Sequence, residues 1–177
     1  MSTGAFDLAA YVRDVPDFPQ PGIVFKDITP LLADARALDA CIAALAEPLR
    51  DQRIDAVCAI ESRGFIFGAA LARDLGAGFV PIRKPRKLPA RTIGIEYALE
   101  YGSDRLEMHI DALVPGTRVL LVDDVVATGG TLLASRALIA QLGANLVAAT
   151  VVIELGFLNA RARWPAGVPL HALIRYW

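Results

Sequence analysis

The stretch VLLVDDVVATGGT, from Val119 to Thr131, decides the fold and carries the densest chemical signal of the chain. Val119 to Val122 form an apolar run of the kind found in a central parallel strand that is covered on both faces. Asp123 and Asp124 follow at the position where an open α/β sheet binds its ligands, beyond the carboxyl ends of the strands. The stretch therefore predicts a buried strand with two carboxylates at its end.

The second half of this stretch is a turn of small residues, in which glycines let the backbone approach a ligand closely. A helix is expected from Leu132, and its positive end would point at the turn, an arrangement that binds anions. Carboxylates beside an anion-binding turn indicate a ligand with both hydroxyl and phosphate groups, such as a sugar phosphate. The residues of the turn are Ala127, Thr128, Gly129, Gly130 and Thr131.

Apolar runs and helical spacings alternate through residues 54–154, which predicts an α/β fold with a doubly wound, mostly parallel sheet flanked by helices. Helices are expected over Ile66–Leu75 and Leu132–Leu142, each followed by a glycine. Strands are expected at Ala56–Ile60, Gly78–Ile82, Thr117–Asp124, Leu146–Glu154 and Leu170–Tyr176.

Residues 83–109 interrupt this alternation. The segment opens with RKPRKLPAR, Arg83 to Arg91, which has five positive charges, two prolines and no acid. Alone it would be a solvated loop, but beside an anion-binding turn it is a candidate lid that brings cations to phosphate groups. Thr92–Tyr101 and Arg105–Ile110 alternate like the two strands of a hairpin.

Length and composition limit the class of protein. The chain has 177 residues, 55% of them hydrophobic, which suits a single domain with a substantial core. Its 18 basic and 19 acidic residues leave a net charge of −1, which gives no support for binding nucleic acid or an anionic membrane. Neither a signal peptide, a transmembrane run nor a zinc-like Cys/His spacing is recognisable, so we expect a cytoplasmic protein.

The motifs together resemble those of type I phosphoribosyltransferases, because VLLVDDVVATGGT is similar to their phosphoribosyl-diphosphate motif. Other stretches stand in the order seen in the adenine phosphoribosyltransferases of this family, and the match covers residues 16–156. These stretches are PGIVFKDITPLL (Pro21–Leu32), ESRGF (Glu61–Phe65), RKPRKLP (Arg83–Pro89) and LEYG (Leu99–Gly102). The resemblance implies the type I fold, with a small N-terminal hood of about residues 1–33 and a flexible hairpin lid of about residues 83–109.

The resemblance also implies which residues bind the donor, 5-phosphoribosyl 1-diphosphate. The turn at 127–131 would hold the 5′-phosphate, and Asp123 and Asp124 the ribose 2′- and 3′-hydroxyls. The diphosphate would lie on the turn at Glu61, Ser62 and Arg63 and against three lid cations, some of them acting in the partner subunit's site. Those cations are Arg83, Lys84 and Lys87.

For the base, the resemblance implies that Phe25 stacks on adenine while backbone groups at Val24 and Lys26 read its edge. Leu155 would contact the opposite face. Glu100 would handle the proton of the base, and Tyr101 would close over the site. Read without the family, Phe25 could be a core residue, Arg63 a surface ion-pair residue, and Glu100 a partner of nearby cations.

The implied reaction converts adenine and the donor to AMP and diphosphate, with Mg²⁺ bound mainly through the diphosphate and no protein metal site assigned. A homodimer is also implied. One alternative is a phosphoribosyltransferase for another purine, although Val151 to Leu155 lack the lysine that 6-oxopurine enzymes offer to the base. The other is a non-catalytic regulator that senses the donor.

Overall fold

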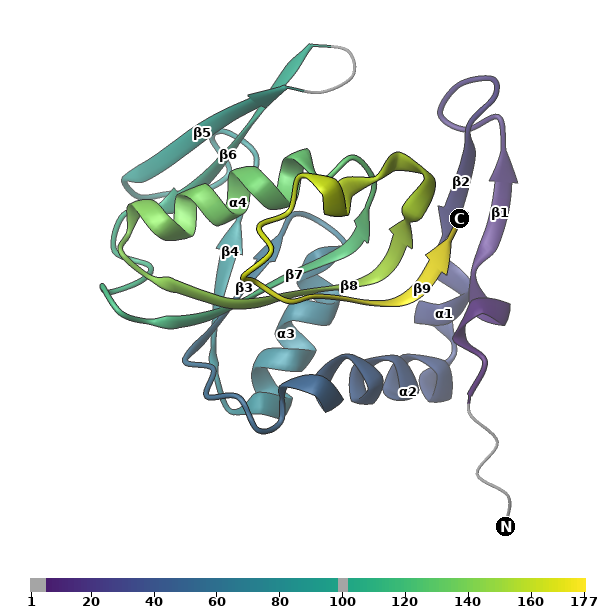
Figure 1. Ribbon diagram of the computed structural model, residues 1–177, viewed down its shortest axis with the longest axis horizontal. Helices are drawn as coiled ribbons and strands as arrows, with labels where there is room; N and C mark the ends of the chain where they lie inside the picture. Colours follow the sequence, from purple (N-terminus) through teal and green to yellow (C-terminus); the bar gives the residue numbers. More distant parts are fainter. Residues whose placement is uncertain (1–5, 99–101) are drawn as a thin grey trace. The chain divides into compact units, whose positions relative to one another are not determined.

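The chain divides into two units, Met1–Ala44 and Leu45–Trp177. A five-stranded parallel sheet is the centre of the second unit (Figure 1). This computed structural model describes residues 6–98 and 102–177. The strand order is β4-β3-β7-β8-β9, and every neighbouring pair is parallel. The strands are β3 (Ala56–Ile60), β4 (Gly78–Ile82), β7 (Arg118–Val126), β8 (Asn145–Leu155) and β9 (Leu170–Tyr176).

The order of the strands places a switch point between β3 and β7. From β3 the chain moves outward to β4, whereas from β7 it moves outward in the opposite direction through β8 to β9. Open α/β sheets bind their ligands in the crevice at the carboxyl ends of strands where the order reverses in this way. The residues that follow β3 and β7 are therefore the expected site.

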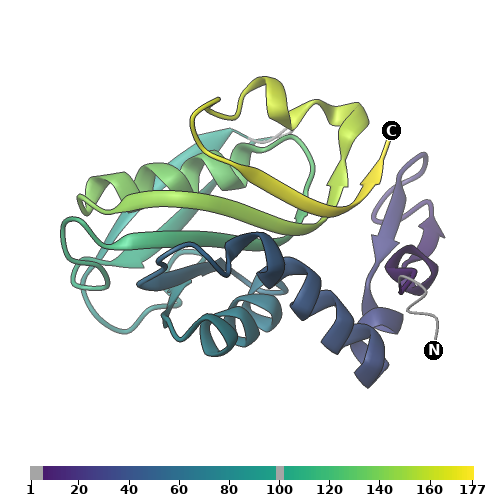
Figure 2. The same ribbon diagram turned by 60° about the horizontal axis from the view of Figure 1, so that its bottom comes forward.

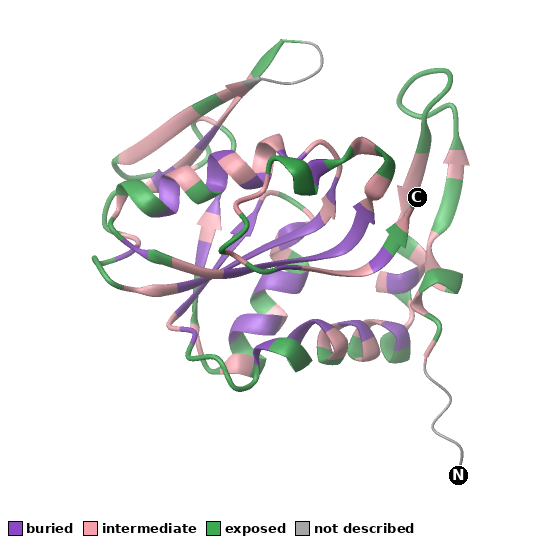
Figure 3. Ribbon diagram, viewed as in Figure 1, coloured by how far each residue is buried: buried purple, intermediate pink, exposed green. Residues whose placement is uncertain are grey.

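Two helices cover opposite faces of the sheet, α3 (Gly64–Leu75) and α4 (Gly130–Gln141) (Figures 1 and 2). α3 packs on β3 and β7, and α4 packs on β7 and β8. With a helix on each face, β3 and β7 are almost entirely buried, as the purple strands of Figure 3 show. Both faces of these strands must be apolar, which explains the continuous apolar runs in their sequence.

An antiparallel hairpin packs against α4 and is formed by β5 (Thr92–Ala98) and β6 (Ser103–His109). Leu106 and Met108 on β6 are fully buried, and Ile93 and Ile95 on β5 pack against the same core. A single antiparallel bridge between Arg83 and Glu107 joins the hairpin to the chain that leaves β4. The apolar face of the hairpin thus attaches the predicted lid to the second unit.

The first unit contains a small antiparallel hairpin and a short helix. β1 (Arg13–Pro16) pairs with β2 (Val24–Asp27), and α1 (Thr29–Ala33) follows directly. The Arg13 guanidinium lies 2.5 Å from the Asp27 carboxylate. A hydrogen bond from the Thr29 N–H and the Arg13 side chain hold the pKa of Asp27 at about 2. α2 (Ala35–Ala46) then carries the chain into the second unit.

The structure confirms the predicted fold class and moves several predicted boundaries. β7 continues two residues beyond Asp124, because Val125 still pairs with Ile153 of β8. α3 and α4 each begin two residues before the first apolar residue of the expected pattern, at glycines that no hydrophobic spacing identifies. Within the described residues, the helices are too short to cross a membrane.

We predict that Gly68→Ala destabilises the fold, because an added Cβ would lie 2.3 Å from Cβ of Ala59 on β3. Overpacking of this kind costs about 1–3 kcal/mol, and each kcal/mol lowers Tm by about 2–4 °C at this chain length. Calorimetry measures the change. Gly167→Ala is the matched control, since nothing lies within 4 Å of its added Cβ. Equal Tm values for the two variants would contradict the close packing of α3 on β3.

Candidate active site

A cavity of about 380 Å³ opens at the carboxyl ends of β3 and β7. All residues that line it belong to the second unit, and they come from the ends of both strands, the basic loop, the hairpin and the first turn of α4. The switch point therefore contains a cavity, as the topology requires. Its lining consists of Ile60, Glu61, Ser62, Arg63, Lys84, Tyr97, Leu106 and residues 123–132.

Two adjacent buried carboxylates line this cavity. Asp123 is 8% exposed and Asp124 is 6% exposed. Burial and the neighbouring Asp124 charge raise the pKa of Asp123 well above its usual range. The Asp124 N–H donates to Asp123 Oδ1 at 2.9 Å, and Arg63 Nε lies 2.5 Å from Asp124 Oδ2. The pair is thus polar, buried and partly neutralised by a single arginine.

The turn after β3 reaches this carboxylate pair through a glycine. The Glu61–Ser62 peptide bond is cis, and α3 begins at Gly64. A Cβ added to Gly64 would lie 3.0 Å from Asp123 Oδ1 and 3.1 Å from the Val122 carbonyl oxygen. A side chain at this position would therefore press on β7 where its carboxylates begin.

The small-residue turn has the geometry of a helix start. Gly129 adopts a left-handed conformation with φ of 84°, and α4 begins at the next residue. The C-terminal part of the chain supports the turn, because a Cβ at Gly129 would lie 3.2 Å from Ala160 Cβ and Arg163 donates to the Thr128 carbonyl oxygen at 3.5 Å. The first N–H groups of a helix lack intrahelical acceptors, so this turn can bind an anion.

An ion-pair network around one buried carboxylate holds that supporting segment in place. Glu154, 2% exposed, accepts hydrogen bonds from Arg161 Nε at 2.7 Å and from Arg161 Nη2 at 2.9 Å. Arg175 Nε lies 3.1 Å from the same carboxylate. Arg161 also donates to the Leu170 carbonyl oxygen. Ala160, immediately before Arg161, is thereby held behind the turn.

The first cation of the basic loop pairs with a carboxylate in this structure. Arg83 Nε donates to Glu61 Oε2 at 3.0 Å, and the Lys84 N–H donates to the same oxygen at 2.9 Å. Burial raises the pKa of Glu61, but these two hydrogen bonds outweigh it and the pKa lies below the usual value. Glu61 therefore connects the turn after β3 to the start of the basic loop.

The second cation of the loop, Lys84, pairs with a carboxylate on the hairpin. Lys84 Nζ forms a very short ion pair with Asp104 Oδ2 on β6, and the Tyr97 hydroxyl on β5 donates to the same oxygen at 3.2 Å. Tyr97 and Thr131 both line the cavity. The hydrogen bond from Lys84 holds the pKa of Asp104 below its usual value, although burial opposes this.

Other predicted site residues lie elsewhere. Lys87 is exposed and offers its carbonyl oxygen to Arg83 Nη1 at 3.1 Å. Leu155 is half-buried at the end of β8 and does not line the cavity. Glu100 and Tyr101 lie outside the described residues.

The predicted hood residues belong to the first unit, on β2. The Phe25 ring packs edge-to-face on Phe18 with centroids 5.2 Å apart, and Lys26 Nζ lies 2.6 Å from Asp14 Oδ1. The Val24 side chain next to them is exposed. In this hairpin, Phe25 and Lys26 thus each have a partner on or beside β1.

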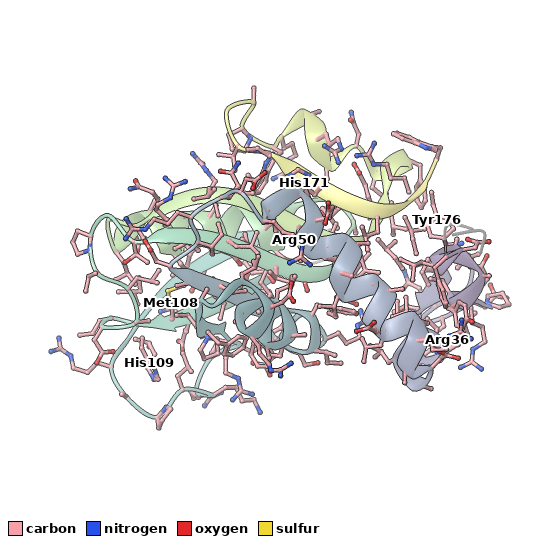
Figure 4. The ribbon with its side chains drawn as sticks, turned by 90° about the horizontal axis from the view of Figure 1, so that it is seen from below. Arg36, Arg50, Met108, His109, His171 and Tyr176 are labelled. Carbon is pink, nitrogen blue, oxygen red and sulfur yellow. The ribbon has the colours of Figure 1, made fainter. Side chains whose placement is uncertain are left out.

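Neither histidine lines the cavity. His109 is beside Met108 on the hairpin, whereas His171 is on β9 (Figure 4). Burial, together with the charge of Arg161, lowers the pKa of His171. The structure therefore gives neither histidine a place in the cavity.

Sequence reasoning assigned no site role to several residues at or beside the cavity, among them Gly64, Tyr97, Asp104 and Leu106. The alternation of the hairpin could have placed Leu106 on its apolar face. The roles of the other three depend on contacts between distant segments, so no local pattern identifies them.

Comparison with known proteins assigns the family. The family model of the phosphoribosyl transferase domain matches residues 28–164. A curated adenine phosphoribosyltransferase of Xanthomonas campestris pv. campestris (strain B100) is 56% identical over 175 residues, which cover 99% of this chain and 94% of that protein.

Solved structures agree with this assignment. Adenine phosphoribosyltransferase from Rhodothermus marinus superposes with a TM-score of 0.91 at 52% identity and covers 96% of both chains. The Saccharomyces cerevisiae enzyme, complexed with an imino-altritol bisphosphate and adenine, gives a TM-score of 0.89 at 39% identity over 94% of this chain and 96% of that one. The chain belongs to the phosphoribosyltransferase family, and within it to the adenine phosphoribosyltransferases, which confirms the resemblance seen in the sequence.

We predict that Asp123→Asn raises Tm by several degrees at pH 7 to 8. Because burial and the Asp124 charge raise the pKa of Asp123 in the folded protein, its carboxyl keeps a proton to higher pH than in the unfolded chain, which releases it above about pH 4. Stability is therefore lost as pH rises from the unfolded pKa to the folded pKa, and asparagine removes this loss. Its oxygen can still accept from the Asp124 N–H.

Thermal unfolding of both proteins between pH 4 and 8 measures the effect. The Tm difference should be small at pH 4 and should grow as pH rises. Asp111→Asn, at an exposed carboxylate, is the control. A Tm difference for Asp123→Asn that stays constant with pH would contradict the prediction.

Proposed function

We propose that this chain transfers the phosphoribosyl group of 5-phosphoribosyl 1-diphosphate to adenine, giving AMP and diphosphate in purine salvage. One observation carries the proposal: two buried carboxylates and a helix-start turn line one cavity at the switch point of the sheet. Carboxylates accept hydroxyl hydrogen bonds, and helix-start N–H groups bind phosphate. Relatives at 56% identity bear the name of this activity.

In the reaction, N9 of adenine attacks C1′ of the ribose while the bond from C1′ to the diphosphate oxygen breaks, with inversion at C1′. Asp123 and Asp124 hold the 2′- and 3′-hydroxyls, and the negative charge that the pair carries lies near the ribose, which becomes positive in the transition state. The turn at 127–131 holds the 5′-phosphate. The sugar is thereby held still while its leaving group and acceptor exchange.

The leaving diphosphate is stabilised by N–H groups at Ser62 and Arg63 and by the cations Arg83, Lys84 and Lys87. In the described structure Arg83 lies against Glu61, so the diphosphate competes with this carboxylate for the Arg83 guanidinium. Binding should therefore weaken with added salt, since several of these charges are partly exposed.

Magnesium is expected to bind mainly through the diphosphate and to spread the negative charge of the leaving group. The residues present fit this, because Mg²⁺ is usually held by substrate phosphates and one or two carboxylates, and Asp123 and Asp124 line the cavity. Within residues 6–98 and 102–177, no group of three or more His, Cys, Asp or Glu side chains could hold a metal.

The base contacts are proposed from the family resemblance. Phe25 stacks on adenine, backbone groups of Val24 and Lys26 read its edge, and Leu155 contacts the other face. Glu100 donates or accepts the proton of the base, with N7 as a proposed site, and Tyr101 covers it. General acid–base assistance of this kind contributes about 10²–10⁴-fold.

The two alternatives have less support. The first alternative, a 6-oxopurine as acceptor, would need a lysine that Val151 to Leu155 do not supply. The similar yeast structure contains adenine. A non-catalytic regulator has no need for a basic loop whose Lys84 lines the cavity.

The proposal also includes a homodimer in the cytoplasm, with no nucleic acid or membrane partner. The family resemblance supports the dimer. Two buried cysteines without a disulfide support the cytoplasm, and the lack of a basic excess supports the absence of a nucleic acid or membrane partner.

A base panel tests the proposed function. Purified protein, the donor and Mg²⁺ are incubated with adenine, hypoxanthine, guanine or xanthine in turn, and nucleotide is measured by chromatography. We expect AMP from adenine and no nucleotide from the other bases. Product from a 6-oxopurine alone would favour the first alternative, and donor binding without product from any base would favour the regulator.

We predict that Glu100→Leu lowers kcat about 10²-fold or more while KM for the donor changes little, because a proton-transfer group acts in the transition state. Steady-state kinetics with both substrates measures this. Glu96→Gln is the matched control, since it removes an exposed carboxylate from β5 of the same hairpin. An unchanged kcat in Glu100→Leu would exclude Glu100 from proton transfer.

A further inference from the structure

We propose that Asp104 is a positioning residue that holds the Lys84 ammonium at the wall of the cavity, ready for the donor's diphosphate. The proposal rests on the proposed function and adds a residue to which the family resemblance gave no role. Asp104 does not itself line the cavity, whereas Lys84 and Tyr97 do. It can therefore act through these neighbours without contacting the substrate.

The first observation is the contact itself. Lys84 leaves the end of β4, and Asp104 lies 20 residues later on β6. Their side chains meet at Lys84 Nζ and Asp104 Oδ2, with exposures of 46% and 19%. A lysine has four rotatable side-chain bonds and loses much rotamer entropy when it is ordered. The less exposed carboxylate thus selects one position for an otherwise mobile cation.

The second observation is that Asp104 is itself held from two sides. Its Oδ1 accepts from the Arg105 N–H at 2.8 Å, and its Oδ2 accepts from the Tyr97 hydroxyl at 3.2 Å. Tyr97 also lines the cavity, as does Thr131 of the phosphate turn. A network of polar contacts therefore joins the basic loop to both strands of the hairpin at the wall of the cavity.

The ammonium group of Lys84 can bind Asp104 and a phosphate group at the same time. An ammonium has three N–H donors, and one carboxylate oxygen occupies only part of them. Donors that Asp104 leaves available can reach phosphate oxygens in the cavity that Lys84 lines. The hydrogen bond to Asp104 also raises the pKa of Lys84, which favours the charged form of its ammonium group.

A purely structural role for Asp104 makes different predictions from a positioning role. A structural carboxylate would stabilise the hairpin, and its loss would affect donor, base and stability together. A positioning carboxylate acts through Lys84, so its loss should affect donor use and should have no further effect once Lys84 is gone. A double-mutant cycle separates the two cases.

The experiment uses the full chain with Asp104→Asn, Lys84→Met and the double variant, and Asp104→Glu as the conservative replacement. Kinetics give kcat/KM for the donor and KM for adenine, and calorimetry gives the Kd of inorganic diphosphate with Mg²⁺. Glu96→Gln is the control for loss of a hairpin carboxylate. Wild-type AMP formation tests the proposed function separately, so failure of one proposal is distinguishable from failure of the other.

We expect Asp104→Asn to lower kcat/KM for the donor about tenfold, the loss expected for an interaction of about 1.4 kcal/mol. Diphosphate should bind correspondingly more weakly, KM for adenine should hardly change, and Asp104→Glu should recover part of the loss. In the Lys84→Met background, Asp104→Asn should change kcat/KM by less than twofold. Equal losses in both backgrounds, or unchanged or tighter diphosphate binding in Asp104→Asn, would overturn the proposal.

Discussion

Two carboxylates buried side by side at the end of the central strand are the constraint on which the rest of the second unit depends. Isolated buried charge is costly, and β7 brings both Asp123 and Asp124 into a region that β3, β8 and α3 enclose. The protein offsets this cost in three ways. It raises the pKa of Asp123, pairs Asp124 with Arg63, and turns a backbone N–H toward the first carboxylate.

The same constraint explains the small residues around the site. Gly64 begins α3 where a side chain would meet Asp123, and Gly129 lies in the phosphate turn, just before α4, where a side chain would meet Ala160. These close approaches hold the N–H groups of two turns at the edge of one cavity. The end of β7, the two turns and the segment behind them therefore pack together. A substitution in any of them should shift the positions of the Asp123 and Asp124 carboxylates.

Charge balance is the second organising feature of the cavity. Arg63 of the turn after β3 and two of the three lid cations each pair with a carboxylate in this structure: Arg63 with Asp124, Arg83 with Glu61 and Lys84 with Asp104. This pairing reconciles a strongly basic loop with a net charge of −1 for the whole chain. An anionic ligand would compete with Asp124 and Glu61 for Arg63 and Arg83. Lys84, in contrast, would stay on Asp104 and bind the ligand through its remaining N–H donors.

The sequence alone determined the strands, the fold class, the phosphate turn and the family, because apolar runs, glycine spacing and the acidic pair are local patterns. It also indicated the hairpin from its alternation. The partner of Lys84, the place of Tyr97 and the need for glycine at position 64 were decided only by the tertiary structure. Each depends on segments that are distant along the chain and meet at the carboxyl ends of β3 and β7. Local patterns report which face of a strand or helix is apolar, whereas polar contacts across the switch point exist only after the sheet, the helices and the hairpin have packed.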